Sequence, residues 1–167
     1  MGPHGASRFR GDGECGYGIH MTTTKMSKPK PKITVAEFNQ LIDKHLLLAA
    51  QFGMRAEKIG PGTATLRLRF HQSHIRPGGT IAGPVQMALA DVALYAVVLS
   101  LLGRVELAVT TSLNINFLRR PAPVDVIAHA KILKIGKRLA VGECALYSDG
   151  EDEMVAHVTG TYSIPPA

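Results

Sequence analysis

One stretch of the chain limits the folds that it can adopt. Residues 85–102 form a nearly unbroken apolar run in which Asp91 is the only charged residue. A helix of this length is almost long enough to cross a bilayer. However, a carboxylate near the bilayer centre costs about 2.5–3.5 kcal/mol, Gln86 adds a second polar group, and no basic cluster flanks the run. The pattern therefore predicts the core helix of a folded domain, with no membrane partner.

The segments around this run alternate between apolar and polar residues, which is typical of half-buried strands. The clearest is residues 63–70, whose even-numbered residues are apolar, and a shorter strand is expected between Gly53 and Gly60. Residues 71–80 are rich in turn formers and indicate a loop. Four further alternating runs follow Gly103, at residues 107–118, 124–134, 138–148 and 154–164.

A helix is expected before the first strand. Thr34 can cap it, and Glu37 stands three residues later, as in a capping box. Apolar spacing continues this helix through residues 38–50. The order is helix, two strands, long apolar helix, four strands. It predicts an α+β fold in which one antiparallel sheet wraps around a long central apolar helix.

Composition divides the chain into a tail and one domain. Hydrophobic residues make up 46% and charged residues 19%, which excludes wholesale disorder. Before Ile33, six Lys and Arg face two acids, and prolines alternate with lysines. We therefore expect residues 1–32 to be a disordered basic tail, part of which need not belong to the native start, and residues 33–167 to be a single domain.

Charge and cysteine content limit which binding partners and which cellular compartment are expected. The net charge of +6 arises mostly in the tail, and the aromatic share is 5% with no Trp, so a nucleic-acid partner is not expected. The two cysteines, Cys15 and Cys144, cannot form a disulfide framework. No signal-peptide core precedes the domain. These features predict a cytoplasmic protein.

Asp91 is the candidate catalytic residue. An aspartate in an apolar helix is costly unless it is paired or used, so it either accepts hydrogen bonds at the helix edge or serves as a general base or nucleophile. Gly83, followed by Pro84, marks the helix start, where a free N–H can stabilise an oxyanion. Asp91 lies about 12 Å further along the axis. A second chain would therefore have to supply one of the two groups.

Two longer segments resemble a known family. They are PGGTIAGPVQMALADVALYAVV, at residues 77–98, and TTSLNINFLRRPAPVDVIAHAKILKIGKR, at residues 110–138. Both resemble the hotdog-fold acyl-CoA thioesterases of the PaaI-type branch, and the resemblance extends over about residues 34–164. It implies a helix wrapped by a curved antiparallel sheet, and a homo-oligomer that is a dimer or a dimer of dimers. It also implies hydrolysis of an acyl-CoA substrate to free CoA and a carboxylic acid, with no cofactor and no metal.

The resemblance also implies site residues. Asp91 matches the catalytic acid, Gly83 the glycine whose N–H polarises the thioester carbonyl, and Thr110 a hydroxyl that helps to place the attacking water. Loops that hold the nucleotide and phosphates of CoA are matched by Phe117, Arg119, Arg120, Gly136, Lys137 and Arg138. Guanidinium and ammonium groups suit phosphates on general grounds as well.

The chain departs from the family pattern at two positions. Ala82 stands where the family usually has His, and Arg76 stands where it often has Asn, so we expect Arg76 at the substrate. These departures leave open a second hypothesis, a catalytically weak acyl-CoA-binding sensor or scaffold on the same fold. A dehydratase is not favoured, because the apolar helix carries no Asp/His pair.

Four smaller expectations concern single residues and one strand face. Thr110 shares one strand face with Ser112, Asn114 and Asn116, and that face is either solvated, part of an interface or, at Thr110, part of the site. His71 and His74 are not expected to hold a metal. An apolar acyl pocket is suggested by Leu94, Tyr95 and Val98. Buried or satisfied positions on strands are expected for Cys144, His129 and His157.

Overall fold

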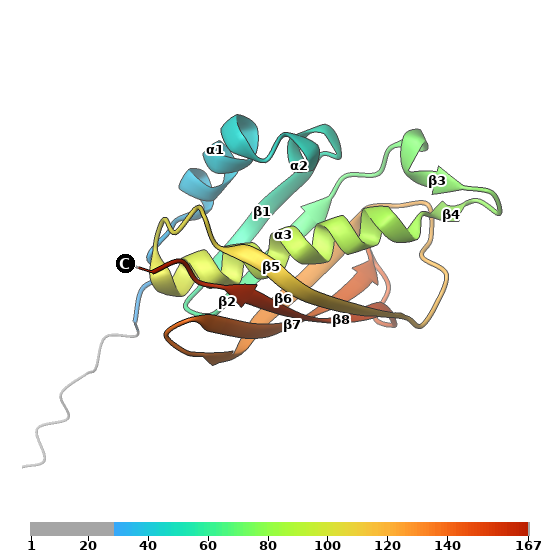
Figure 1. The fold of residues 1–167 in the computed structure, drawn as a ribbon. Coiled ribbons are helices and arrows are strands. Elements are labelled where there is room, and N and C mark those ends of the chain that lie inside the picture. The colour runs from blue at the N-terminus through green and yellow to red at the C-terminus, as the bar shows by residue number, and fades with distance from the viewer. Residues whose placement is uncertain (1–28, 167) are drawn as a thin grey trace, which may run out of the picture.

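The computed structural model describes residues 29–166, so most of the predicted tail lies outside the described residues (Figure 1). Six strands form one antiparallel sheet in the order β1-β2-β6-β7-β8-β5. They are β1 (Met54–Gly60), β2 (Thr63–Leu68), β5 (Val109–Phe117), β6 (Val126–Ile135), β7 (Leu139–Ser148) and β8 (Met154–Ser163). Near the start of the described residues, Ile33 is buried, and Lys32 N–H donates to the carbonyl of Ser100 (2.8 Å).

The long helix α3 (Gly83–Leu102) lies across one face of the sheet (Figure 1). By length and composition alone it could span a membrane, but 67% of its most apolar window is buried inside the fold. The predicted core helix is therefore confirmed. Two glycines bring it close to the sheet, because a Cβ at Gly160 or Gly142 would lie 2.6 or 2.8 Å from a methyl carbon of Leu94. This arrangement of one antiparallel sheet around one apolar helix is the hotdog fold, as predicted.

The first helix is capped as expected but is shorter than expected. In α1 (Val35–His45), Glu37 N–H donates to Thr34 Oγ1 (3.2 Å), and Thr34 N–H donates to Glu37 Oε2 (2.8 Å). The predicted continuation through residue 50 is wrong, because Leu46 leaves helical geometry (φ −108°, ψ 59°) and a separate helix α2 (Leu47–Gln51) follows. After this break, Ala49 is buried in the core, while Leu47 and Leu48 remain exposed.

The segment expected to be a loop contains regular structure. A short 3-10 helix (Gln72–His74) leads into a hairpin of β3 (Ile75–Arg76) and β4 (Thr80–Ile81), which runs directly into α3. Gly78 and Gly79 form its turn with φ of 98° and 73°, a conformation that favours glycine. Ala82 N–H donates to the carbonyl of His74 (2.8 Å). The hairpin is thereby fixed to the start of the long helix.

The prediction that Thr110 shares a strand face with Ser112, Asn114 and Asn116 is wrong. The pairing of β5 with β8 shifts by one residue between Thr110 and Ser112, so Thr111 is a bulge. The extra residue turns Thr110 toward α3, on the side where Leu113 and Ile115 pack against the core. The exposed positions 112, 114 and 116 remain together on the opposite face.

Candidate functional site

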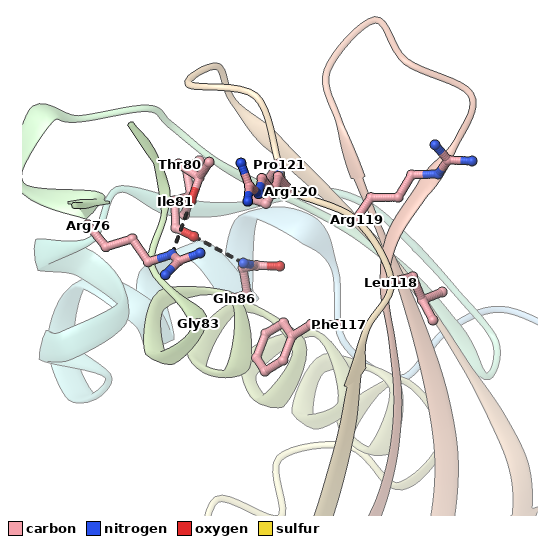
Figure 2. Close-up of a pocket in the computed structure, with 10 residues that line it drawn as sticks. All are labelled: Arg76, Thr80, Ile81, Gly83, Gln86, Phe117, Leu118, Arg119, Arg120 and Pro121. Atoms are coloured by element: carbon pink, nitrogen blue, oxygen red, sulfur yellow. Dashed lines mark hydrogen bonds between the residues drawn. The ribbon is translucent and has the colours of Figure 1, made fainter. Parts of the chain in front are cut away.

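A cavity of about 470 Å³ lies at the start of α3 (Figure 2). The β3–β4 hairpin, the first turn of α3 and the segment after β5 form its walls. Its lining residues are Arg76, Thr80, Ile81, Gly83, Gln86, Phe117, Leu118, Arg119, Arg120 and Pro121. Five of the sequence-predicted site residues therefore meet here, although they come from three separate parts of the chain.

Gly83 presents a free backbone donor to this cavity. Ala82 caps the helix, and its carbonyl accepts hydrogen bonds from Val85 N–H (3.1 Å) and Gln86 N–H (3.3 Å). Within residues 29–166, Gly83 N–H has no hydrogen-bond acceptor. The positive end of the helix dipole lies at the same place. A Cβ at Gly83 would lie 3.0 Å from the ring of Phe117, so the ring packs directly on the glycine.

Arg76 lies over the same helix start. Its Nε donates to Thr80 Oγ1 (3.1 Å) across the hairpin, and the side chain enters the cavity in Figure 2. The turn at Gly78 and Gly79 brings the two residues opposite each other. A positive guanidinium and the Gly83 donor thus line the same cavity.

Gln86 was not identified from the sequence as a site residue. Its side chain is 3% exposed, and its Nε2 donates to the carbonyl of Ile81 (3.1 Å). Its Oε1 is buried without a partner in the described part of the chain. One signal was available in the sequence: Gln86 is one of the few polar residues of an apolar helix and lies three positions after Gly83.

Asp91 lies in a second cavity, of about 330 Å³. Its Oδ1 accepts hydrogen bonds from Thr110 Oγ1 (2.7 Å) and from the hydroxyl of Tyr162 (2.7 Å), which also lies 2.7 Å from the Asp91 carbonyl. Burial raises the pKa of Tyr162, and the Asp91 charge raises it further, so the hydroxyl stays protonated and donates. The sequence pattern did not identify Tyr162, because β8 brings it to Asp91 from 71 positions away.

The walls of this second cavity are mostly apolar. Besides Asp91 they comprise His45, Leu46, Leu47, Leu48, Ala49, Met54, Ala88 and Val92. The expectation that Leu94, Tyr95 and Val98 line an acyl pocket is wrong. Those three side chains are buried in the core at 2%, 7% and 2% exposure. Leu94 packs against Gly142 and Gly160 of the sheet, and the Tyr95 ring packs against Phe38 of α1 and Tyr162 of β8.

The residues expected to bind CoA do not come together within one chain. Arg119 and Arg120 follow the end of β5, where Phe117 pairs with Ala156 of β8. The turn containing Gly136, Lys137 and Arg138 precedes β7, whose Leu139 pairs with Ser163 at the opposite end of β8. Ser163 also pairs with Val109, at the start of β5. The turn therefore lies at one end of β5 and the two arginines lie at the other.

The remaining titratable candidates have structural partners. His129 Nδ1 lies 3.2 Å from Thr65 Oγ1, and His157 Nε2 lies 3.1 Å from Glu143 Oε2. Cys144 is buried, which raises its pKa to about 12. The expectations for these three residues are confirmed. In the described part of the chain, no group of three or more His, Cys, Asp or Glu residues could hold a metal ion.

Comparison with known proteins decides the family. Residues 78–155 match the family model of the thioesterase superfamily. The chain is also 30% identical over 135 residues to a “putative esterase” of Saccharolobus solfataricus, in an alignment that covers 80% of this chain and 87% of that protein. This chain belongs to the thioesterase superfamily.

Solved structures place it within that superfamily. The crystal structure of a “putative thioesterase” from Silicibacter sp. TM1040 is 39% identical, with a TM-score of 0.72, and the match covers 86% of this chain and 97% of that chain. A mutant of the phenylacetic acid degradation protein PaaI from Thermus thermophilus is 25% identical, with a TM-score of 0.64, and the match covers 71% of this chain and 99% of that chain. The chain is a hotdog-fold thioesterase of PaaI type, as the two resembling segments predicted.

Proposed function

We propose that this chain hydrolyses acyl-CoA thioesters at a site shared by two copies of itself. Asp91 of one copy acts as general base or nucleophile, and Gly83 N–H of the other stabilises the oxyanion. One observation carries the proposal: the two half-sites lie at opposite ends of the edge strand β5. Asp91 is bonded to Thr110, at its start, and Gly83 contacts Phe117, at its end.

The outer edge of β5 supports pairing with a second copy. β5 is the last strand of the sheet and has no neighbour on that side within residues 29–166. Edge strands with free backbone groups are templates for pairing, and apolar side chains here are exposed, with Val109 at 57% and Phe117 at 51%. Opposed residues of an antiparallel pair point to the same face, so the two β5 strands would pair about Asn114, which sets Phe117 opposite the partner's bulge at Thr110 and Thr111.

This register would assemble the site. Opposed residues in an antiparallel pair lie about 4.5–5.5 Å apart at Cα, so Asp91 of one copy would approach the partner's Gly83. The same two-fold axis would move the Gly136–Arg138 turn toward the partner's Arg119 and Arg120. Both the catalytic pair and the CoA-binding set would then be completed by the symmetry that is commonest among oligomers.

The chemistry follows from these positions. The thioester carbonyl accepts the Gly83 hydrogen bond, and the guanidinium of Arg76 adds positive charge beside it, which stabilises the oxyanion that forms. If Asp91 acts as base, it takes a proton from water, and the hydroxide attacks the carbonyl carbon. The tetrahedral intermediate collapses, the C–S bond breaks, and the proton passes from Asp91 to the CoA thiolate.

One observation favours the alternative of a weakly catalytic sensor. The N-cap residue Ala82 offers no side-chain hydrogen bond at the helix start, so one donor expected from the family pattern is missing. The sensor hypothesis predicts acyl-CoA binding without turnover. A panel of acyl-CoA esters assayed for release of free thiol, with binding measured in parallel, separates the two functions.

Mixing two inactive variants tests the shared site. Asp91→Asn removes the carboxylate, and Gly83→Pro removes the N–H at the first helical position, where proline is common. Gly83→Ala keeps the N–H and is the control for the added Cβ, which would meet the Phe117 ring. In a mixed dimer, one site loses both groups and the other keeps both. Random mixing makes half of the dimers mixed, so about a quarter of the unmodified activity should return. If each copy carried a complete site, no activity would return, and the proposed arrangement would be wrong.

A further inference from the structure

The side-chain amide of Gln86 donates a hydrogen bond through its nitrogen, whereas its oxygen has no partner within residues 29–166. The carbonyl of Ile81 can only accept, so the Gln86 atom 3.1 Å away must be the donating nitrogen. This fixes the oxygen on the other side, and Figure 2 shows it directed away from Ile81. The side chain is 3% exposed, and its oxygen has no partner in residues 29–166. Buried acceptors are rarely left unpaired, so the free oxygen indicates a ligand with a hydrogen-bond donor.

The position of Gln86 specifies where that donor must be. Gln86 follows Gly83 by three residues, so the two lie on one face of α3 about one turn apart. Both line the same cavity. Gly83 contributes a free donor and Gln86 a free acceptor. The Gln86 amide reaches back toward the helix start, because it donates to the carbonyl of Ile81. A ligand that satisfies both groups therefore has an acceptor and a donor that are close together in its structure.

A pantetheine thioester has these two groups close together. Its carbonyl oxygen is an acceptor, and the first amide N–H follows after the sulfur and two methylene carbons. The apolar side chains of Ile81, Phe117 and Leu118 line the cavity and suit the sulfur and methylenes. A simple thioester without the amide would leave the Gln86 oxygen unpaired, and such sites discriminate strongly against the analogue that lacks the donor.

We propose that the Gln86 oxygen accepts a hydrogen bond from the pantetheine amide N–H nearest the sulfur, and thereby holds the thioester carbonyl on Gly83 N–H. The inference rests on the proposed function and extends it. Gln86 is a substrate-binding residue that makes the chain selective for pantetheine-type thioesters, whether they are carried by CoA or by a carrier protein.

An isosteric pair of substrates tests this contact. One is the thioester of N-acetylcysteamine, and the other is the thioester of 2-mercaptoethyl acetate, in which oxygen replaces the amide N–H. Both carry the acyl group that the unmodified chain hydrolyses fastest, and both rates are divided by the uncatalysed hydroxide rates. Free thiol release is measured for the unmodified chain, for Gln86→Met, which keeps the side-chain volume, and for Gln40→Met as an exposed control.

The amide substrate should give a kcat/KM at least about tenfold higher in the unmodified chain and in Gln40→Met. In Gln86→Met the two substrates should agree within about twofold. Equal rates in the unmodified chain would overturn the inference while leaving the proposed function intact, as would full discrimination in Gln86→Met. Failure of the unmodified chain to hydrolyse any CoA or cysteamine thioester would overturn the proposed function, and the inference with it.

Discussion

Two regions of the long helix α3 differ in how their polar groups are hydrogen-bonded. At the start of α3, a backbone donor and a side-chain acceptor lack hydrogen-bond partners within residues 29–166, whereas two turns further along, the Asp91 carboxylate accepts from two hydroxyls. Gly83 N–H and Gln86 Oε1 have no hydrogen-bond partner within residues 29–166. Asp91 Oδ1 lies 2.7 Å from the hydroxyls of Thr110 and Tyr162. In the proposed function, the first region binds the substrate, and the second holds the Asp91 charge in one orientation.

The cavities at the two regions differ in the same way. The helix-start cavity carries donors and three arginines, while the Asp91 cavity is mostly apolar. A thioester has a polar CoA arm and an acyl group of its own, so the two cavities suit its two ends. In the proposed function, the Gly83 donor and the Asp91 carboxylate are separated along α3, so a second copy would have to bring them together.

The largest effect is expected from removal of the Asp91 charge. Asp91→Asn keeps the oxygen that accepts from Thr110 and Tyr162 but cannot act as a base. Turnover of acyl-CoA should fall about 100-fold or more, while the melting temperature should hold or rise, because a partly buried charge is removed. Undiminished hydrolysis by a stable variant would refute the role of Asp91. A marked loss of melting temperature would instead favour a purely structural aspartate.

The apolar cavity should control the choice of acyl group. Ala88 lines it one turn before Asp91, and Ala88→Leu would fill part of its 330 Å³. We expect kcat/KM for long or aromatic acyl groups to fall about tenfold relative to acetyl-CoA, since overfilled cavities exclude bulky ligands. Equal losses for all acyl groups would show that the acyl chain lies elsewhere.

The arginines at the helix-start cavity should affect CoA binding without changing acyl preference. Arg120→Ala should raise KM severalfold for every acyl-CoA and reduce the salt dependence of binding, because a phosphate contact is screened by ions. Lys137→Ala should act in the same way if the partner's turn joins the site. Lys58→Ala, on the opposite edge strand, is the control. A change in acyl selectivity would contradict the assignment.

The smallest effect is expected from His74, whose carbonyl holds the start of α3 through Ala82. Burial lowers the pKa of His74 from its ordinary value of 6.5. The unfolded chain therefore binds a proton first as the pH falls, and stability should decline below about pH 6.5, by at most about 1.4 kcal/mol for each pH unit. Denaturant unfolding of His74→Leu and of the unmodified chain between pH 7 and 5 should show a smaller slope in the variant. Equal slopes would exclude this contribution.

Much of the fold could be predicted because its signals are local. The capping box of Thr34 and Glu37, the alternation in residues 63–70 and the apolar run around Asp91 each depend on residues close in sequence. The failures lie where packing overrides a local period. The break at Leu46 and the bulge at Thr111 follow from how α2 and β5 meet the core, and the bulge reverses the face of Thr110.

The sequence by itself determined the architecture and the kinds of group in the site: a glycine at a helix start, an acid in an apolar helix, and arginines after a strand. Only the tertiary structure showed that Tyr162 reaches Asp91, that Leu94 lies in the core, and that the oxygen of Gln86 has no partner within residues 29–166. Hydrogen-bond satisfaction depends on partners far apart in the sequence. It is therefore decided by the packing of α3 against the sheet and the hairpin.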